Sequence, residues 1–285
     1  MWAQQYRDVI AKAHDAALCL VLVEQTLGSV PRERGAWMAV FEDQMVGTIG
    51  GGHLEFQAMQ HAHELLAGGV EARIPHDEQR RYPLGPALGQ CCGGIVTLRF
   101  VLLARGCAEA LATYLYQPVE RVALFGAGHV GRALIHLLSS LPYQLRWLDS
   151  RDAVFPKLEP WLVQCEHSDP VQSAVHDLAP GSHVLVMSFS HAEDLEIVAQ
   201  CLARQRERGD LGYVGLIGSK TKWARFAHRL RARGFAEAEL ARITCPIGIA
   251  GITGKEPEVI AVAVAAQLLQ LRSAAGRAGP GMGRP

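Results

Sequence analysis

The stretch that decides the fold is Arg121-Val-Ala-Leu-Phe-Gly-Ala-Gly-His-Val-Gly-Arg132. Residues 122–125 form a short apolar run that is typical of a buried strand, and residues 132–138 have the apolar spacing of a helix. The pattern G-x-G-x-x-G at residues 126–131 lies between them, which is the setting that this motif needs in order to bind a nucleotide.

Each glycine of this motif has a physical reason. Gly126 permits the tight turn, Gly128 lets the backbone approach a phosphate, and Gly131 lets the helix pack on the strand. The helix that starts near His129 offers partial positive charge to an anion. Asp149 ends the next apolar run, where an acid would hold a ribose hydroxyl. We therefore predict a mononucleotide- or dinucleotide-type Rossmann half, and the alternative is a structural turn without a ligand.

Bulk composition excludes several function classes. The 285 residues include 28 basic and 28 acidic side chains, so the chain has no charge footprint for nucleic acid or an anionic membrane. No apolar run reaches ~18 residues, and the N-terminus lacks the apolar core of a signal peptide. The seven scattered cysteines do not resemble a disulfide framework, so we expect a cytoplasmic protein.

The order of apolar runs predicts two domains of the α/β class. Residues 1–104 read as a smaller α+β domain, and residues 105–119 as a connector that contains a helix. Residues 120–275 alternate strands and helices, including a helix at 169–178, which predicts a parallel sheet covered on both faces. Residues 276–285, rich in Gly and Pro, are expected to be a disordered tail. A further strand is expected at residues 70–74.

Three glycines, Gly50, Gly51 and Gly52, precede His53 between an expected strand and an expected helix. Three consecutive glycines are costly in chain entropy, so they indicate a place where the backbone closely approaches something else. The start of the helix again favours an anion. His53 is a candidate ligand contact, and the alternative is a capping or surface histidine.

The most chemically suggestive stretch is Gln90-Cys91-Cys92-Gly93-Gly94. Adjacent cysteines rarely bridge each other without strain, and flanking glycines free backbone amides that stabilise a thiolate. Such a thiolate could attack an electrophile, carry a persulfide sulfur or ligate a soft metal. The alternative is two ordinary buried cysteines. The chain has no C-x-x-C pair and no H-E-x-x-H, so a structural zinc site is poorly supported.

Polar residues also follow later strands of the predicted parallel sheet, at the edge where such sheets bind ligands. His191 ends Ser188-Phe-Ser-His, and Ser219 and Lys220 end Ile217-Gly-Ser-Lys. His191 either contacts a ligand or caps its helix. Lys220 either contacts a phosphate or is solvated.

Taken together, these residues resemble the XdhC/CoxI family over about residues 4–272. The motif Gly89-Gln-Cys-Cys-Gly-Gly94 is the most specific part of the resemblance. The complete set of motifs that carry it is Gly28-Ser-Val-Pro-Arg32 with Gly35, Gly47-Thr-Ile-Gly-Gly-Gly52 with Leu54-Glu55, Leu84 to Gly94, Gly126 to Gly131, Gly215-Leu-Ile-Gly-Ser-Lys220 and Pro246-Ile-Gly248.

The resemblance implies a maturation factor and not a metabolic enzyme. Members of this family bind molybdenum cofactor (molybdopterin), protect it while a cysteine desulfurase partner replaces an oxo ligand by sulfide, and deliver it to the molybdenum subunit of xanthine dehydrogenase. The implied fold is an N-terminal domain followed by a Rossmann-like domain, and many members are homodimers. Cys91 or Cys92 matches the cysteine position associated with the cofactor and would face the molybdenum. The implied cofactor contacts are Gly50, Gly51, Gly52, His53, Cys91, Cys92, Gly126, Gly128, His129, Gly131, Asp149, His191, Ser219 and Lys220.

The sequence departs from the family pattern at two places. Many relatives have cysteine after the glycine triplet, where this chain has His53. Many relatives also have an acidic residue after the C-terminal proline, where this chain reads Gly248-Ile-Ala-Gly-Ile-Thr. Because of both departures, Cys91 and Cys92 are the stronger candidates for contact with the molybdenum cofactor.

Two other functions remain open from the residues alone. The glycine motif and Asp149 would suit an NAD(P)-dependent oxidoreductase, although no Tyr-x-x-x-Lys or comparable acid–base pair follows the motif. Cys91, Cys92 and His53 would suit a metal or sulfur carrier.

Overall fold

The computed structural model describes residues 2–68, 76–84, 93–115, 119–156 and 163–278. The chain divides into two compact units, Trp2–Gln117 and Pro118–Pro285, which we call the N-terminal and C-terminal units. The strand expected at residues 70–74 lies outside the described residues.

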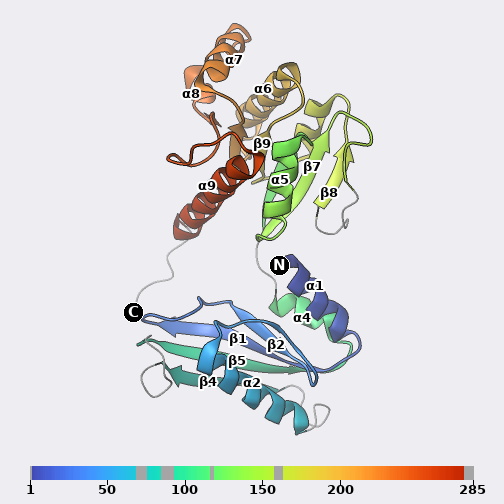
Figure 1. Ribbon diagram of the computed structural model, residues 1–285, viewed down its shortest axis with the longest axis vertical. Helices are drawn as coiled ribbons and strands as arrows, with labels where there is room; N and C mark the ends of the chain where they lie inside the picture. Colours follow the sequence, from blue (N-terminus) through green and yellow to red (C-terminus); the bar gives the residue numbers. More distant parts are fainter. Residues whose placement is uncertain (1, 69–75, 85–92, 116–118, 157–162, 279–285) are drawn as a thin grey trace. The chain divides into compact units, whose positions relative to one another are not determined.

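The N-terminal unit is built on an antiparallel sheet in the order β3-β2-β1-β5-β4 (Figure 1). β1 is central because it pairs with β2 on one side and with β5 on the other. The elements of this unit are α1 (Trp2–Ala13), β1 (Leu18–Leu27), β2 (Trp37–Val40), β3 (Met45–Gly47), α2 (Gly52–Ala67), β4 (His76–Pro83), β5 (Ile95–Leu103) and α4 (Ala108–Tyr114).

The first six residues of β1 are buried on both faces because helices cover both sides of this sheet. Cys19 and Val21 face α2 in one apolar cluster, whereas Leu18 and Leu20 face α1 and α4 in another. Leu111 of α4 is fully buried in the second cluster, so the helix expected within the connector belongs to the core of this unit.

The C-terminal unit is a parallel sheet in the order β11-β10-β9-β6-β7-β8. Counted from β6, this is the 3-2-1-4-5-6 order of a Rossmann domain, and the order reverses between β6 and β9. The fold class expected from the sequence is therefore confirmed. The elements are β6 (Glu120–Phe125), α5 (His129–Leu138), β7 (Tyr143–Asp149), β8 (Val163–His167), η2 (Val171–Asp177), β9 (His183–Val186), α6 (His191–Glu207), β10 (Tyr213–Leu216), α7 (Lys220–Ala232), α8 (Glu237–Leu240), β11 (Ile243–Thr244) and α9 (Pro257–Ala278).

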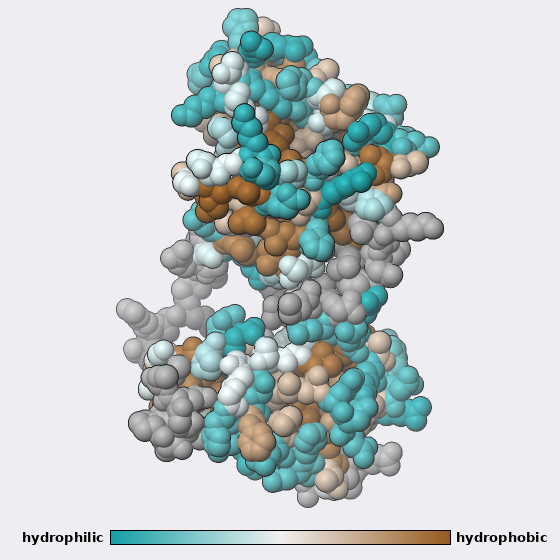
Figure 2. Space-filling model, in the orientation of Figure 1, coloured by the Kyte–Doolittle hydropathy of each residue, from teal (hydrophilic) through white to brown (hydrophobic). Residues whose placement is uncertain are grey.

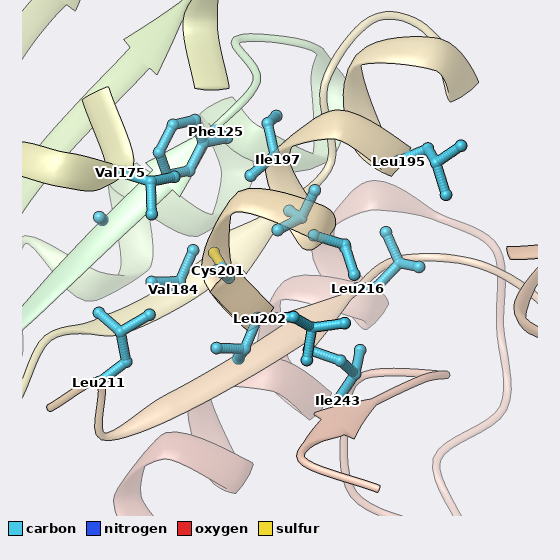
Figure 3. Packing of buried hydrophobic residues seen from close by; sticks show 14 of the residues in the cluster. Phe125, Val175, Val184, Leu195, Ile197, Cys201, Leu202, Leu211, Leu216 and Ile243 are labelled. Atoms are coloured by element: carbon cyan, nitrogen blue, oxygen red, sulfur yellow. The ribbon is translucent and has the colours of Figure 1, made fainter. Parts of the chain in front are cut away.

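Two apolar clusters hold helices on both faces of this sheet. Leu124 and Trp147 pack with α5 and α9 on one face. Phe125 and Val184 pack with α6 and η2 on the other face, as Figure 3 shows. Alternate residues of one strand thus enter opposite clusters, which is the burial pattern of a doubly covered parallel sheet.

Two expected elements differ from the structure. The helix expected at residues 169–178 is present as a shorter 3-10 helix, Val171–Asp177. In addition, α9 continues to Ala278, beyond residue 276 where the tail was expected to begin.

Two glycine-rich candidate sites

The glycine turn after β6 has the geometry that its sequence predicts. A Cβ atom at Gly126 would lie 2.0 Å from the Met187 carbonyl oxygen, and one at Gly131 would lie 2.2 Å from the Gly126 carbonyl oxygen. At Gly128, by contrast, a Cβ atom would have nothing within 4 Å. Gly126 and Gly131 are therefore required by packing, whereas Gly128 leaves the approach to the start of α5 open.

Asp149, predicted to hold a ribose hydroxyl, is bound by its own chain. It is only 2% exposed, and its Oδ2 accepts a 2.6 Å hydrogen bond from the Ala127 N–H. Its Oδ1 accepts hydrogen bonds from the Arg151 N–H and Nε, and its Oδ2 also accepts one from Arg151 Nη2. Both carboxylate oxygens are thus engaged within the protein, and the carboxylate connects two loops at the edge of the sheet.

His129, the first residue of α5, lines a groove of about 480 Å³ between α5 and α9. Ala133, Leu137 and Ala261 contribute apolar walls to this groove. Figure 2 shows hydrophobic side chains gathered on the C-terminal unit in this region, and Val262 of α9 is among the exposed apolar residues.

The other predicted residues of this edge lie at two helix starts. Ser219 caps α7, because its hydroxyl accepts a hydrogen bond from the Lys222 N–H. Lys220 is exposed at the first position of α7. His191 is exposed at the first position of α6, with its ring 6.5 Å from the ring of Phe226.

A buried ion pair, which the sequence did not reveal, holds these two helix starts together. Lys222 Nζ donates to Asp194 Oδ2 at 2.6 Å and to the Ile217 carbonyl at 2.8 Å. Asp194 Oδ1 accepts from both the N–H and the hydroxyl of Ser188. Lys222 is therefore the lysine that orders this edge, whereas Lys220, predicted as a phosphate contact or a solvated residue, is exposed.

In the N-terminal unit, three glycine-rich stretches that are distant in sequence come together. A Cβ atom at Gly94 would lie 2.4 Å from the Ser29 carbonyl oxygen, and one at Gly28 would lie 3.3 Å from the Gly94 Cα. A Cβ atom at Gly50 would lie 2.7 Å from Pro31 Cβ. We call this meeting of residues 28–32, 48–52 and 93–94 the glycine junction.

Cys91 and Cys92 lie outside the described residues, but both ends of their segment are described. The Leu84 N–H donates a 2.7 Å hydrogen bond to the Gly94 carbonyl, next to the paired residues Pro83 and Ile95 of β4 and β5. The described residues on either side of the cysteine pair, Leu84 and Gly94, are thus hydrogen-bonded to each other, and Gly94 belongs to the glycine junction.

Glu55 organises the turn that precedes α2. Its Oε2 accepts hydrogen bonds from the Thr48 hydroxyl and from the N–H groups of Ile49 and Gly51. Gly50, Gly51 and Gly52 all have positive φ, a region that side chains other than glycine rarely adopt. This explains the glycine triplet, and it shows that two amides near the start of α2 are already committed.

His53 is exposed in the first turn of α2. Its Nε2 lies 3.1 Å from Gln57 Nε2, and its ring centroid is 6.4 Å from that of Phe56. His53 is therefore accessible next to the glycine junction and does not cap the helix through a side-chain hydrogen bond.

Burial raises the pKa of every cysteine that the structure describes. Burial raises the pKa of Cys201 to about 12, and burial, with a contribution from Glu78, raises that of Cys19 to about 12. Burial also raises the pKa of Cys245. Within the described ranges, no group of three or more His, Cys, Asp and Glu side chains could hold a metal ion. None of the described helices combines the length and apolarity needed to cross a membrane.

The strand order and glycine turn define the C-terminal unit as a Rossmann domain, joined here to an antiparallel unit with a glycine junction. Residues 122–268 match the XdhC Rossmann domain, and residues 10–76 match the XdhC and CoxI family. The chain therefore belongs to the XdhC and CoxI family.

Two similar proteins place this assignment in context. The chain is 28% identical over 249 residues to the uncharacterized protein YqeB of Escherichia coli (strain K12), covering 86% of this chain and 42% of YqeB. The chain thus spans less than half the length of that curated relative. A crystal structure from Bacillus halodurans, described as a xanthine dehydrogenase, has the same fold. Its TM-score is 0.76 at 19% identity, with 96% of this chain and 98% of that chain covered.

Proposed function

We propose that this protein is a maturation factor that binds molybdenum cofactor, holds it for sulfuration and delivers it to the molybdenum subunit of xanthine dehydrogenase. A cysteine desulfurase is the proposed sulfur source. Membership of the XdhC and CoxI family supports the general maturation role. The cofactor is cargo in this proposal, and the protein performs no turnover reaction of its own.

The observation that carries the proposal is the hydrogen bond between Leu84 and Gly94. It joins the described residues on either side of Cys91 and Cys92, and Gly94 lies next to Gly28 in the glycine junction. Thiolates are preferred ligands of soft metal centres. Because Gly94, which follows the pair by two residues, lies in the glycine junction, we propose that Cys91 and Cys92 hold a sulfur-rich molybdenum cargo near it.

Cargo content tests the proposal directly. Protein purified natively should contain molybdenum and pterin, measured by elemental analysis and by fluorescence of the oxidised pterin. We expect Cys91→Ala or Cys92→Ala to lose most of both. Cys165→Ala is the matched control, because Cys165 is an exposed cysteine in β8 of the other unit. If both variants of the pair retain the cargo of the parent protein, the cysteine assignment is wrong.

Partner binding tests the delivery step separately. Purified, cargo-loaded protein should activate molybdenum-free xanthine dehydrogenase only after the desulfurase has supplied sulfur. We also propose a homodimer, which light scattering of the purified chain would check. Activation without any contribution from this protein would contradict the delivery role, whatever the cargo content.

A further inference from the structure

The exposed side of α7 carries a local excess of positive charge. This helix contains five lysine and arginine residues and no acidic residue, and it lies on the outside of the C-terminal unit (Figure 1). Over the whole chain, basic and acidic side chains balance at 28 each. Phe226, Ala227 and Leu230 pack the other side of α7 into the core. The cations of α7 are therefore concentrated at the surface.

Arg225 and Arg229 stand out because the fold does not neutralise them. Within the described ranges, neither residue forms a hydrogen bond or an ion pair. Arg233, the C-cap of α7, binds both oxygens of the Glu196 carboxylate. This hydrogen bond, followed by the charges of Arg233 and Arg229, lowers the pKa of Glu196. The acid nearest to Arg229 is thus already occupied by another arginine.

These two arginines border a hollow of about 660 Å³, which we call the α7 groove. The groove is lined by His191 of α6 and by Thr221, Ala224, Arg225, His228 and Arg229 of α7. All six side chains are exposed, and none of them is acidic. A small anion would remain in contact with water here, and surface charge pairs in water are weak. A larger partner would cover the groove and exclude that water.

The charge pattern of α7 does not stabilise the helix itself. Arg225 and Arg229 are four residues apart, so their like charges repel each other across one turn. The first turn contains Lys220 and Lys222 and no acid, although the start of a helix favours acids. Lys222 is compensated by its ion pair with Asp194. An anionic partner would compensate Arg225 and Arg229 in the same way.

The spacing of these cations indicates the shape of the partner. An α-helix rises 1.5 Å per residue, so Arg225 and Arg229 are separated by about 6 Å along the axis. Carboxylates four residues apart on a second helix have the same separation of about 6 Å. The small side chains of Thr221 and Ala224 leave room for such a helix to lie in the groove. The balanced charge of the whole chain does not favour nucleic acid.

We propose that the α7 groove is the docking site for an acidic α-helix of a partner protein, whose carboxylates pair with Arg225 and Arg229. We assign this helix to the protein that receives the cargo, an assignment that rests on the proposed function. Charge pairs at an exposed surface accelerate association and add little to the lifetime of a complex. Such a contact suits a partner that must bind, accept the cofactor and leave.

A peptide probe tests the groove independently of maturation. The probe is an alanine-rich helical peptide with glutamate at every fourth position, and its counterpart has glutamine instead. Fluorescence anisotropy should show that the full chain binds the glutamate peptide at low salt and loses it as salt screens the charges. We expect the glutamine peptide, and the double variant Arg225→Glu with Arg229→Glu, to weaken binding about tenfold or more. No binding of the glutamate peptide, or parent-like binding by the double variant, would overturn the proposal.

Arg105→Glu with Arg121→Glu is the matched control, because it reverses the same number of exposed charges away from α7. It should bind the glutamate peptide as the parent protein does. Thermal unfolding checks that both double variants keep the fold, and Arg225→Gln with Arg229→Gln repeats the test if charge reversal unfolds α7. A DNA duplex that binds more tightly than the peptide and displaces it would identify a nucleic-acid surface, and the proposal would be wrong.

Binding to molybdenum-free xanthine dehydrogenase tests the assignment of the partner. We expect the Arg225→Glu, Arg229→Glu variant to associate about tenfold more slowly with it and to keep the molybdenum and pterin of the parent protein. If only binding to the cysteine desulfurase is lost, the assignment to the cargo recipient is wrong. If the peptide binds as expected but the parent protein binds neither enzyme, the maturation proposal fails, and the acidic-helix site stands.

Discussion

The Ala127 N–H donates a 2.6 Å hydrogen bond to Asp149 Oδ2, so the acid that ends β7 holds the glycine turn that follows β6. Arg151 completes the contact by binding both oxygens of the same carboxylate. In this chain the acid of the Rossmann motif therefore has a structural role. Its hydrogen bonds hold the glycine turn and fix the position of Arg151, so its oxygens are not free to bind a ligand.

Asp149→Asn should destabilise the C-terminal unit at neutral pH. The amide keeps the shape of the carboxylate but loses the charge that binds Arg151, and it cannot accept at both positions. Hydrogen bonds to buried charged groups are worth about 1.5–3 kcal/mol, so we expect a loss of about 2 kcal/mol in urea unfolding. Asp152→Asn, at an exposed neighbouring acid, is the control. A loss of similar size in both variants would contradict the role of Asp149.

The interaction between Asp149 and Arg151 also predicts how stability depends on pH. Burial by itself would raise the pKa of Asp149, but hydrogen bonds from the Arg151 side chain and from the Ala127 and Arg151 amides lower it below its usual value. A carboxyl with a lowered folded pKa adds stability above its unfolded pKa of about 3.9, and this stability is lost as the pH falls through the folded pKa. The stability difference between parent and Asp149→Asn should thus be constant above about pH 5 and shrink below about pH 4. A difference that grows on acidification would refute this.

Gly131 and Gly128 form a matched pair of substitutions within one turn. Gly131→Ala would place a methyl group 2.2 Å from a backbone oxygen that cannot move freely, whereas Gly128→Ala meets nothing within 4 Å. Overpacking of this kind costs about 3 kcal/mol, while an alanine at the helix cap costs less than about 1 kcal/mol. Thermal unfolding of the two variants measures the difference. Equal melting temperatures would show that Gly131 has no packing role.

Gly94 and Gly93 provide a similar comparison next to the cysteine pair. A Cβ atom at Gly94 would meet the Ser29 oxygen at 2.4 Å and the Leu27 oxygen at 2.7 Å, but one at Gly93 would meet nothing within 4 Å. We expect Gly94→Ala to displace the anchored end of the cysteine segment and to lose most of the bound molybdenum. Gly93→Ala should retain it. Full cargo in Gly94→Ala would show that the glycine junction does not position the cysteines.

Lys222→Met tests the ion pair beneath the edge of the sheet. The change leaves the buried Asp194 carboxylate, 2% exposed, without its cation. Breaking a buried pair in this way costs about 3 kcal/mol. Lys220→Met, at an exposed residue two positions earlier, should change the unfolding free energy by less than about 0.5 kcal/mol. A larger loss of unfolding free energy in Lys220→Met than in Lys222→Met would contradict the structural role of Lys222.

The fold could be predicted from the sequence where periodicity and glycine chemistry agree. The run at residues 122–125, the motif at 126–131 and Asp149 together predict the first half of the Rossmann sheet, and the structure has it. Residues 169–178 show a limit of such prediction. A helix was expected there and a helix is present, but it has the 3-10 form over Val171–Asp177, and apolar spacing alone does not distinguish this form from an α-helix.

The candidate sites could be predicted only in part, because tertiary contacts decide which polar groups are free. Asp149 was identified by its spacing, but its binding to Ala127 depends on two strands lying side by side. Lys222 and Lys220 are equivalent in sequence, and only the packing of α7 against α6 distinguishes them. Local sequence shows which groups are present and not which of them remain available.

The carboxylate of Glu55 places a negative charge next to the glycine triplet, residues 50–52. With Oε2 already bound to Thr48, Ile49 and Gly51, a negative group sits at the positive end of α2 and compensates its dipole. A phosphate arriving here would be repelled, whereas the hydrogen-bond donors of a neutral ring edge would be attracted. If molybdenum cofactor binds at this turn, its phosphate should therefore point away from the start of α2.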